Sequence, residues 1–204
     1  MLKRTIVWII SLAASLNVLA ITPEEVMAKA VSKIESAPGI AGRYTAGGDL
    51  GSASGSFRFD GRRAFMESPQ GGKSWYDGRN LWTLNPRTKE VTISIPDREE
   101  LMAVNPMLYV TGYRQGYRLF FSKKTDPGKY LVLLNPKKGG TGIKAIEIGI
   151  NKGNFMPEHI LVRDESDRRT LINLRNLSYT RKFMNSDFTF PAAKYKGYET
   201  VDLR

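Results

Sequence analysis

Hydrophobic positions recur at helical spacing once, near the start of the chain. The apolar stripe consists of Val26, Met27, Ala30, Val31 and Ile34. Polar residues fill the positions between them, which is the pattern of an amphipathic helix. Thr22 can cap this helix, Pro23 suits its first turn and Glu25 completes a capping box. Residues 37–39, Ala-Pro-Gly, end it, so the sequence predicts one helix that covers an apolar surface.

Beyond Gly39 the pattern changes to alternation with a period of two, which is typical of half-buried strands. The predicted strands are 56–60, 75–76, 81–84, 91–95, 117–121, 130–135, 143–150, 159–163 and 170–180, with a short one at 188–190. Turn sequences such as Asp77-Gly78 and Asp126-Pro127-Gly128 separate them. Since helical crossovers are missing between these strands, we expect an antiparallel and strongly curved sheet.

One segment interrupts the strand pattern. Residues 97–100, Asp-Arg-Glu-Glu, repeat the capping-box logic, and apolar residues follow up to Val104. Asn105-Pro106 breaks this helix, and a second helix-compatible stretch runs from Met107 to Gly112. Two short helices joined at a proline could close the mouth of a curved sheet. An ordinary helix that covers the core explains the same pattern.

The first twenty residues have the three parts of a secretory signal peptide. A basic start at Lys3-Arg4 precedes an uncharged apolar run, and Val18-Leu19-Ala20 provides a small-residue cleavage site. We therefore expect residues 1–20 to be removed and residues 21–204 to form a single domain in the periplasm. The chain has no cysteine, which excludes disulfides, thiol catalysis, thiolate metal sites and a lipid anchor at the cleavage site.

The chain carries a net charge of +11 but lacks the motifs of common enzyme classes. An exported basic protein is expected to meet anionic lipid headgroups or envelope polymers and no nucleic acid, although the charge can also serve only solubility. His159 is the single histidine, which excludes a His-rich metal site, and no G-x-S-x-G turn is present. We expect no catalytic residue, metal or cofactor. Paired acids, such as Glu99 with Glu100 or those within 164–167, leave a secreted hydrolase open as an alternative.

Several motifs carry a resemblance to a known family. The run Trp75–Pro86, WYDGRNLWTLNP, is followed by Glu90-Val91-Thr92 and resembles the signature of the outer-membrane lipoprotein carrier (LolA-like) family. Asn105-Pro106 after an apolar helix and Asp187–Phe190 are similar to further pieces of that family. The end of the chain, 195–204, resembles its Bacteroidetes-type branch.

This resemblance implies both a fold and a function. Family members form an incomplete, half-open β barrel whose apolar concave face is covered by an N-terminal helix and a helical lid. They act as periplasmic chaperones that collect acylated lipoproteins from an inner-membrane release complex and deliver them to an outer-membrane acceptor. We therefore expect a monomeric, non-enzymatic carrier. An envelope lipid-binding or lipoprotein-sensing protein on the same scaffold is the alternative.

Candidate site residues follow from strand faces and from the resemblance. The predicted lipid-binding cavity comprises Phe57, Phe59, Trp82, Leu84, Val91, Ile93, Ile95, Ile146, Ile148 and Ile150. The predicted lid residues are Leu101, Met102 and Leu108. Plain core packing explains each of these positions equally well. Typical members hold the lid with the arginine of an Arg-Pro step, which residues 59–65 lack, so Arg62 or Arg63 is the candidate substitute.

Overall fold

The computed structural model describes residues 20–114, 116–140 and 142–204, so the predicted signal peptide lies outside the described residues except for Ala20. The helices are α1 (Pro23–Ser36), α2 (Arg98–Val104) and α3 (Leu108–Thr111), with short 3-10 turns at Gly112–Arg114, Asn185–Asp187 and Ala192–Tyr195. The strands are β1 (Ile40–Gly48), β2 (Gly51–Asp60), β3 (Arg63–Glu67), β4 (Lys73–Tyr76), β5 (Leu81–Asn85), β6 (Glu90–Ser94), β7 (Tyr117–Phe121), β8 (Lys129–Pro136), β9 (Ile143–Asn151), β10 (Pro157–Asp164), β11 (Arg169–Ser178) and β12 (Glu199–Asp202).

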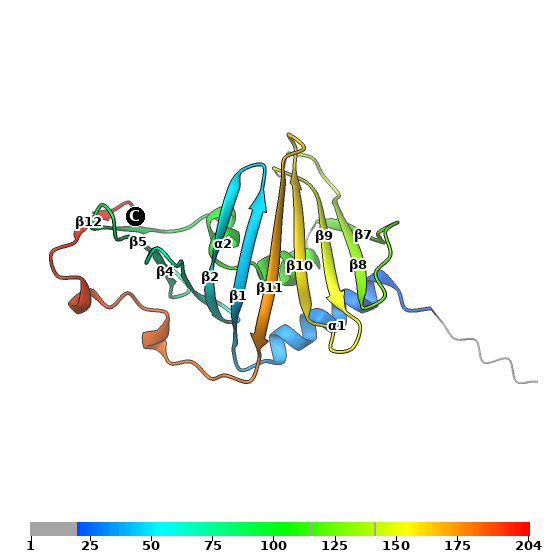
Figure 1. Ribbon diagram of the computed structural model, residues 1–204, viewed down its shortest axis with the longest axis horizontal. Coiled ribbons are helices and arrows are strands. Elements are labelled where there is room, and N and C mark those ends of the chain that lie inside the picture. Colours follow the sequence, from blue (N-terminus) through cyan, green and yellow to red (C-terminus); the bar gives the residue numbers. More distant parts are fainter. Residues whose placement is uncertain (1–19, 115, 141) are drawn as a thin grey trace, which may run out of the picture.

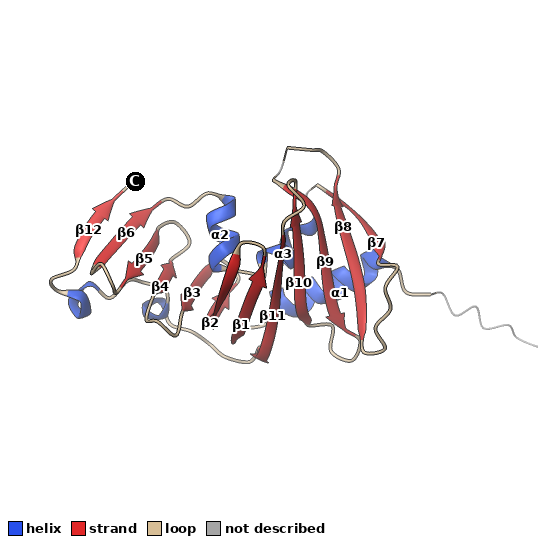
Figure 2. Ribbon diagram, turned by 45° about the horizontal axis from the view of Figure 1, so that its top comes forward, coloured by secondary structure: helices blue, strands red, loops and turns tan. Residues whose placement is uncertain are grey.

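All these strands belong to one sheet, in the order β12-β6-β5-β4-β3-β2-β1-β11-β10-β9-β8-β7. Neighbours pair antiparallel except β12, which runs parallel to β6. The end strands β7 and β12 lie far apart, and Figure 2 shows the sheet as an elongated, open surface. The expected mainly antiparallel sheet is confirmed. The expected half-open barrel is not, because the sheet is neither closed nor strongly curled.

The large core lies between one face of the sheet and the helices, and we call this side the helix face. Thr22 caps α1 as predicted: its Oγ1 accepts from the Glu25 backbone N–H at 3.2 Å, and the Glu25 carboxylate accepts from the Thr22 N–H at 2.8 Å. The stripe of α1, from Val26 to Ile34, is at most 3% exposed. It packs with apolar side chains of β1, β2 and β8–β11 and with α3. Figure 1 shows α1 lying across β8–β10.

A second, small core lies on the opposite, outer face of β3–β6. It contains Phe65, Trp75, Leu84, Val91 and Phe188. Phe65 and Met66 are neighbours in β3 but belong to the small and the large core respectively, because successive side chains of a strand point to opposite faces. A barrel needs one continuous concave face. Here the two ends of the sheet bury opposite faces, which explains why it stays open.

The small core is completed by residues 179–198, which we call the C-terminal segment. Phe188 is fully buried, and the Phe190 and Tyr195 rings lie 5.4 and 6.0 Å from the ring of Trp75. Asp187 forms an ion pair with Arg58 of β2 at 3.0 Å. The predicted strand at 188–190 is therefore wrong: this stretch follows a 3-10 turn and packs its rings on the sheet without joining it.

Strand β11 contains a bulge at Asn176, where the pairing with β1 shifts register after Arg43↔Arg175. The backbone of Asn176 adopts a positive φ of 54°. Leu174 and Leu177 both pack on the large core although they are three residues apart. The bulge makes this spacing possible and leaves both Arg175 and Asn176 available to the outer face.

Candidate functional site

An apolar groove opens on the helix face between α2, α3 and the ends of β9–β11. Its volume is about 360 Å³, and its lining residues are Leu50, Met102, Tyr109, Gly142, Ile143, Val162, Asp164, Arg168 and Thr170. Tyr109, Ile143 and Val162 also pack against the large core. The groove therefore leads directly onto the buried apolar interior.

The rim of this groove carries one ion pair. The Arg168 Nε atom donates to Asp164 Oδ2 at 2.7 Å, and the Arg168 backbone N–H donates to Oδ1 at 2.9 Å. Desolvation raises the pKa of Asp164, but hydrogen bonds from Arg168 outweigh it and place that pKa below its usual range. The rim is therefore charged at neutral pH, while aliphatic and aromatic side chains form most of the walls.

Helix α2 separates this groove from a second one between α2 and α3. The second groove has a volume of about 520 Å³ and is lined by Pro96, Asp97, Arg98, Leu101, Met102, Leu108, Thr111, Gly112 and Arg114. Met102, which is 6% exposed, lines both. The side chain of Met102 is therefore part of the wall of both grooves.

Local sequence sets the position of α2. Asp97 Oδ1 accepts from the Glu100 N–H at 2.9 Å, and the Glu100 carboxylate accepts from the Asp97 N–H at 3.0 Å, which confirms the predicted capping box. At the other end the buried side chain of Asn105 accepts from the Met107 N–H at 3.1 Å. This bond satisfies a buried polar group and fixes the turn at Pro106 between α2 and α3.

The predicted cavity residues divide between the two faces of the sheet. Phe57, Phe59, Ile146, Ile148 and Ile150 lie together in the large core and are at most 2% exposed. Trp82, Leu84 and Val91 belong to the small core on the other side, and Ile93, opposite Trp82 in the pairing, shares their face. Ile95 follows β6 and is 59% exposed. One cavity does not include all ten.

The predicted lid residues and the two candidate arginines lie in different parts of the molecule. Leu101, Met102 and Leu108 all line the groove between α2 and α3, as a lid would require. Arg62 is exposed in the turn before β3. Arg63 donates to Asp60 and to Asn185, and its guanidinium lies 4.7 Å from the centre of the Phe188 ring. These contacts fasten the C-terminal segment to the outer face and not α2 to the sheet.

Sequence reasoning missed most of the groove wall. Leu50 lies in the tight turn between β1 and β2, within a stretch rich in glycine and serine that shows little alternation. Val162 and Thr170 lie within predicted strands, and they face the helices because β10 and β11 pair there. The alternation in 159–163 was the only signal for Val162, and it did not reveal which face is covered.

The described residues give little support for a metal site or for the paired acids of a hydrolase. Within 20–114, 116–140 and 142–204 no group of His, Cys, Asp and Glu side chains is arranged to hold a metal ion. The acids of 164–167 are engaged in surface turns: Asp164 with Arg168, Glu165 with the Gly140 N–H at 2.9 Å, and Asp167 with Lys144 at 2.6 Å. In the same ranges, every helix is too short or too polar to cross a bilayer.

The fold is similar to that of solved proteins with low sequence identity. An uncharacterized conserved protein from Thermus thermophilus aligns with a TM-score of 0.59 at 12% identity, over 88% of this chain and 98% of that one. A chain of the Pseudomonas aeruginosa MucA/MucB complex aligns with a TM-score of 0.51 at 9% identity, over 83% of this chain and 61% of that one. At such identities the likeness establishes the fold alone.

Sequence comparison gives the family. No curated protein matches the chain by sequence. The sequence profile described as "Outer membrane lipoprotein carrier protein LolA" matches residues 16–166, which is well over half of the chain. The match spans α1, the signature run in β4–β6, the two short helices and the strands up to β10. This chain belongs to the LolA-like outer membrane lipoprotein carrier family.

Proposed function

We propose that this protein is a periplasmic carrier that binds the acyl chains of lipoproteins released from the inner membrane and delivers them to the outer membrane. Members of its family are typically non-enzymatic carriers. The cargo is an acylated lipoprotein, and the partners are an inner-membrane release complex and an outer-membrane acceptor. The protein works as a monomer after its signal peptide has been removed.

The physical need for such a carrier follows from the cost of exposing hydrocarbon to water. Each buried methylene contributes about 0.8 kcal/mol, so a chain of about fourteen carbons costs roughly 11 kcal/mol to expose. A carrier must replace the burial that the bilayer provides without holding the chain so strongly that transfer stops. A cover that packs weakly when the site is empty meets both requirements.

The apolar groove beside α2 is the observation that carries this proposal. It opens onto the large core, and its volume of about 360 Å³ falls in the range of about 300–1,000 Å³ that is typical of small-ligand pockets. Met102 of α2 forms a shared wall with the second groove. We infer that an acyl chain enters beside Leu50 and Val162, and that α2 moves outward to lengthen the space as the chain inserts.

A charge at the groove mouth tests this placement. Leu50 is 64% exposed in the turn between β1 and β2, so Leu50→Glu should leave the fold intact while placing a carboxylate in the path of the acyl chain. We expect a fluorescent palmitate analogue to bind this variant at least about tenfold more weakly than the original protein, because a charge is costly to bury in an apolar site.

The matched control is Leu203→Glu, which makes the same change at a residue that is 66% exposed near the C-terminus. It should bind the analogue like the unmodified protein. Equal binding by the Leu50 and Leu203 variants, with the fold of both intact by circular dichroism, would exclude this groove as the entry point.

A lipid-binding or lipoprotein-sensing protein on the same scaffold is the second candidate. Five of the predicted cavity residues are already packed in the large core, and the remaining groove is small. A lipid with one chain fits such a groove more readily than a lipoprotein with several. Depleting the protein distinguishes the two: loss of a carrier strands lipoproteins in the inner membrane, whereas loss of a sensor changes only a stress response.

A further inference from the structure

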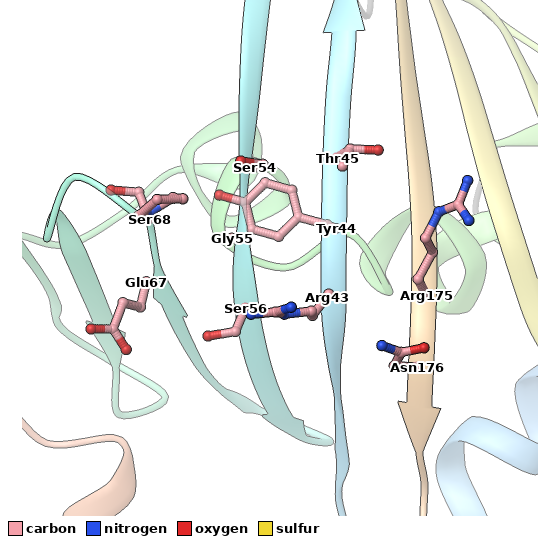
Figure 3. A pocket seen from close by; sticks show the side chains of 11 residues that line it. Arg43, Tyr44, Thr45, Ser54, Gly55, Ser56, Glu67, Ser68, Arg175 and Asn176 are labelled. Carbon is pink, nitrogen blue, oxygen red and sulfur yellow. The ribbon is translucent and has the colours of Figure 1, made fainter.

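A second candidate site is a cleft that lies away from the apolar groove, where β2 runs past the end of β3. Its volume is about 630 Å³, and it is lined by residues of β1, β2 and β11 together with the turn after β3. The last pair between β2 and β3 is Ser56↔Glu67, so Ser54 and Gly55 have no pairing partner on β3. Figure 3 shows the polar side chains that gather there.

Two arginines on neighbouring strands dominate this cleft. Arg43 of β1 and Arg175 of β11 are direct partners in the antiparallel pairing, which places their Cβ atoms roughly 4.5–5.5 Å apart. Like charges directly opposite each other destabilise a sheet. Within the described part of the chain neither arginine has an acidic partner. Figure 3 shows their guanidinium groups pointing apart, Arg43 toward Ser56.

The bulge at Asn176 creates this juxtaposition. It inserts one residue between Leu174 and Leu177, both of which pack on the large core, and so sets Arg175 opposite Arg43. The backbone of Asn176 has a positive φ of 54°, a conformation that residues other than glycine adopt at some cost. Bulges often orient side chains at functional sites. Two unfavourable features, the strained backbone and the paired cations, thus coincide at one cleft.

The remaining lining residues favour an anion. The hydroxyl groups of Thr45, Ser54 and Ser56 and the side-chain amide of Asn176 offer hydrogen-bond donors. Glu67 also lines the cleft, but its carboxylate already forms an ion pair with Lys73 at 3.0 Å. The cleft therefore holds two uncompensated positive charges and several neutral donors.

An adjoining cleft of about 450 Å³ shares Arg175 and Asn176 and is also lined by Lys129, Glu158 and His159. Its Lys129 forms ion pairs with Asp126 at 2.9 Å and with Glu158 at 3.6 Å. Burial lowers the pKa of His159 below its usual value, more than the nearby acids raise it, so the ring is neutral at neutral pH. Among the described residues, Arg175 lines both clefts and forms an ion pair with no acid in either.

We propose that Arg43 and Arg175, with the hydroxyl groups beside them, bind a phosphate group. Arginine donates paired hydrogen bonds to phosphate oxygens. Two guanidinium groups on adjacent strands can rotate toward each other and bind the same phosphate dianion or phosphodiester. The group belongs either to an anionic lipid headgroup or to a free phosphate ester. This site goes beyond the carrier function, because it is separate from the apolar groove and does not require an acyl chain.

The test uses inorganic phosphate and the variants Arg43→Gln and Arg175→Gln. Phosphate should bind the unmodified protein saturably and raise its melting temperature relative to chloride at equal ionic strength. Each variant should bind at least about tenfold more weakly, since a charge-assisted hydrogen bond contributes on that order. Without phosphate each variant should melt at the same or a higher temperature, because one of two repelling charges is gone.

Arg79→Gln is the matched control, because it removes the same charge from an exposed turn between β4 and β5. A second arm compares vesicles of phosphatidylglycerol with vesicles of phosphatidylcholine. Loss of phosphatidylglycerol binding in both variants but not in the control assigns the site to lipid headgroups, and loss of phosphate binding alone assigns it to free esters. The proposal fails if neither ligand binds saturably, or if Arg79→Gln weakens binding as much as the other two.

Discussion

Gly55 shows how closely the strands approach one another at single positions. A Cβ atom at this residue would lie 2.1 Å from the carbonyl oxygen of Glu67 and 3.0 Å from the Tyr44 ring. The backbone of β3 and the ring of Tyr44 therefore occupy the space that any other side chain would need. Gly47, in the neighbouring strand β1, has nothing within 4 Å of the same position.

Gly55→Ala should consequently lower the free energy of unfolding by about 1–3 kcal/mol, the usual cost of forcing an extra group into a packed site. Urea denaturation measures this change. Gly47→Ala is the control and should have little effect or stabilise slightly, since alanine restricts the unfolded chain. Equal losses in the two variants would show that strand flexibility, and not the close approach, decides the outcome.

Asp202 and Arg204 form an ion pair near the C-terminus, and this pair lowers the pKa of the aspartate. Hydrogen bonds from the Arg204 guanidinium, at 2.6 and 2.9 Å, and from its backbone N–H lower the pKa of Asp202 to about 2. Since the unfolded value is about 3.9, the stabilisation that this pair provides is present above that pH and is lost as the pH falls through about 2.

An NMR titration of the Asp202 carboxyl carbon should therefore give a midpoint near 2. Arg204→Gln should return the midpoint toward the ordinary value, whereas Arg79→Gln should leave it unchanged. A midpoint at the ordinary aspartate value in the unmodified protein would mean that the pair does not persist in solution.

At the level of elements, local signals predicted the structure well where a few neighbouring residues decide it. Both capping boxes, at Thr22 and Asp97, form as expected because each needs only residues three positions apart. The hairpin at Asp77 and the break at Pro106 follow from turn chemistry in the same way. Strands β3 and β12 were not predicted. Strand β1 and the first half of β2 were not predicted either, since their glycine, serine and alanine residues give little alternation.

Helix α2 is attached less firmly than α1. It has seven residues, packs against β3 and α3, and buries Met102, whereas α1 has fourteen residues and five fully or almost fully buried side chains. Segments with few buried contacts open at low free energy. These properties suit the movable cover that is proposed above.

Hydrogen exchange followed by mass spectrometry should show the difference. Peptides from α2 should exchange at least roughly tenfold faster than those from α1, and a bound acyl analogue should slow exchange in α2 more than in α1. The same protection in both helices, with or without the analogue, would contradict a role for α2 as the moving cover.

At the level of the whole molecule, the sheet carries one core on each face. Periodicity showed which residues alternate but not which face each segment buries, because that depends on the C-terminal segment, far away in sequence. Residues predicted for one cavity, such as Phe57 and Leu84, are consequently on opposite sides. The open sheet could not be distinguished from a curled one for the same reason.

The two cores should be separable in unfolding experiments. From Ile21 onward both tryptophans, Trp75 and Trp82, belong to the small core or pack against it, so tryptophan fluorescence, excited selectively over tyrosine, reports on that region. Phe188→Ala should lower the free energy of unfolding of the small core by about 3–5 kcal/mol, because the Phe188 ring is fully buried there. The fluorescence transition should then precede the circular dichroism transition in urea.

Leu203→Ala, an exposed change close by, should leave the two transitions as they are in the unmodified protein. Coincident transitions in Phe188→Ala would show that the sheet couples the two cores into one cooperative unit.

The parallel pairing of β12 with β6 has a consequence for the order of assembly. The final strand joins a partner that precedes it by more than half the chain length, and the aromatic rings that seal Trp75 arrive just before it. Until the C-terminal segment has packed, β6 is an unpaired edge strand and the Trp75 side of the sheet is exposed to water. All residues that line the apolar groove precede the C-terminal segment, so a chain cut short after β11 would already form the groove yet be open to proteases at the other end of the sheet.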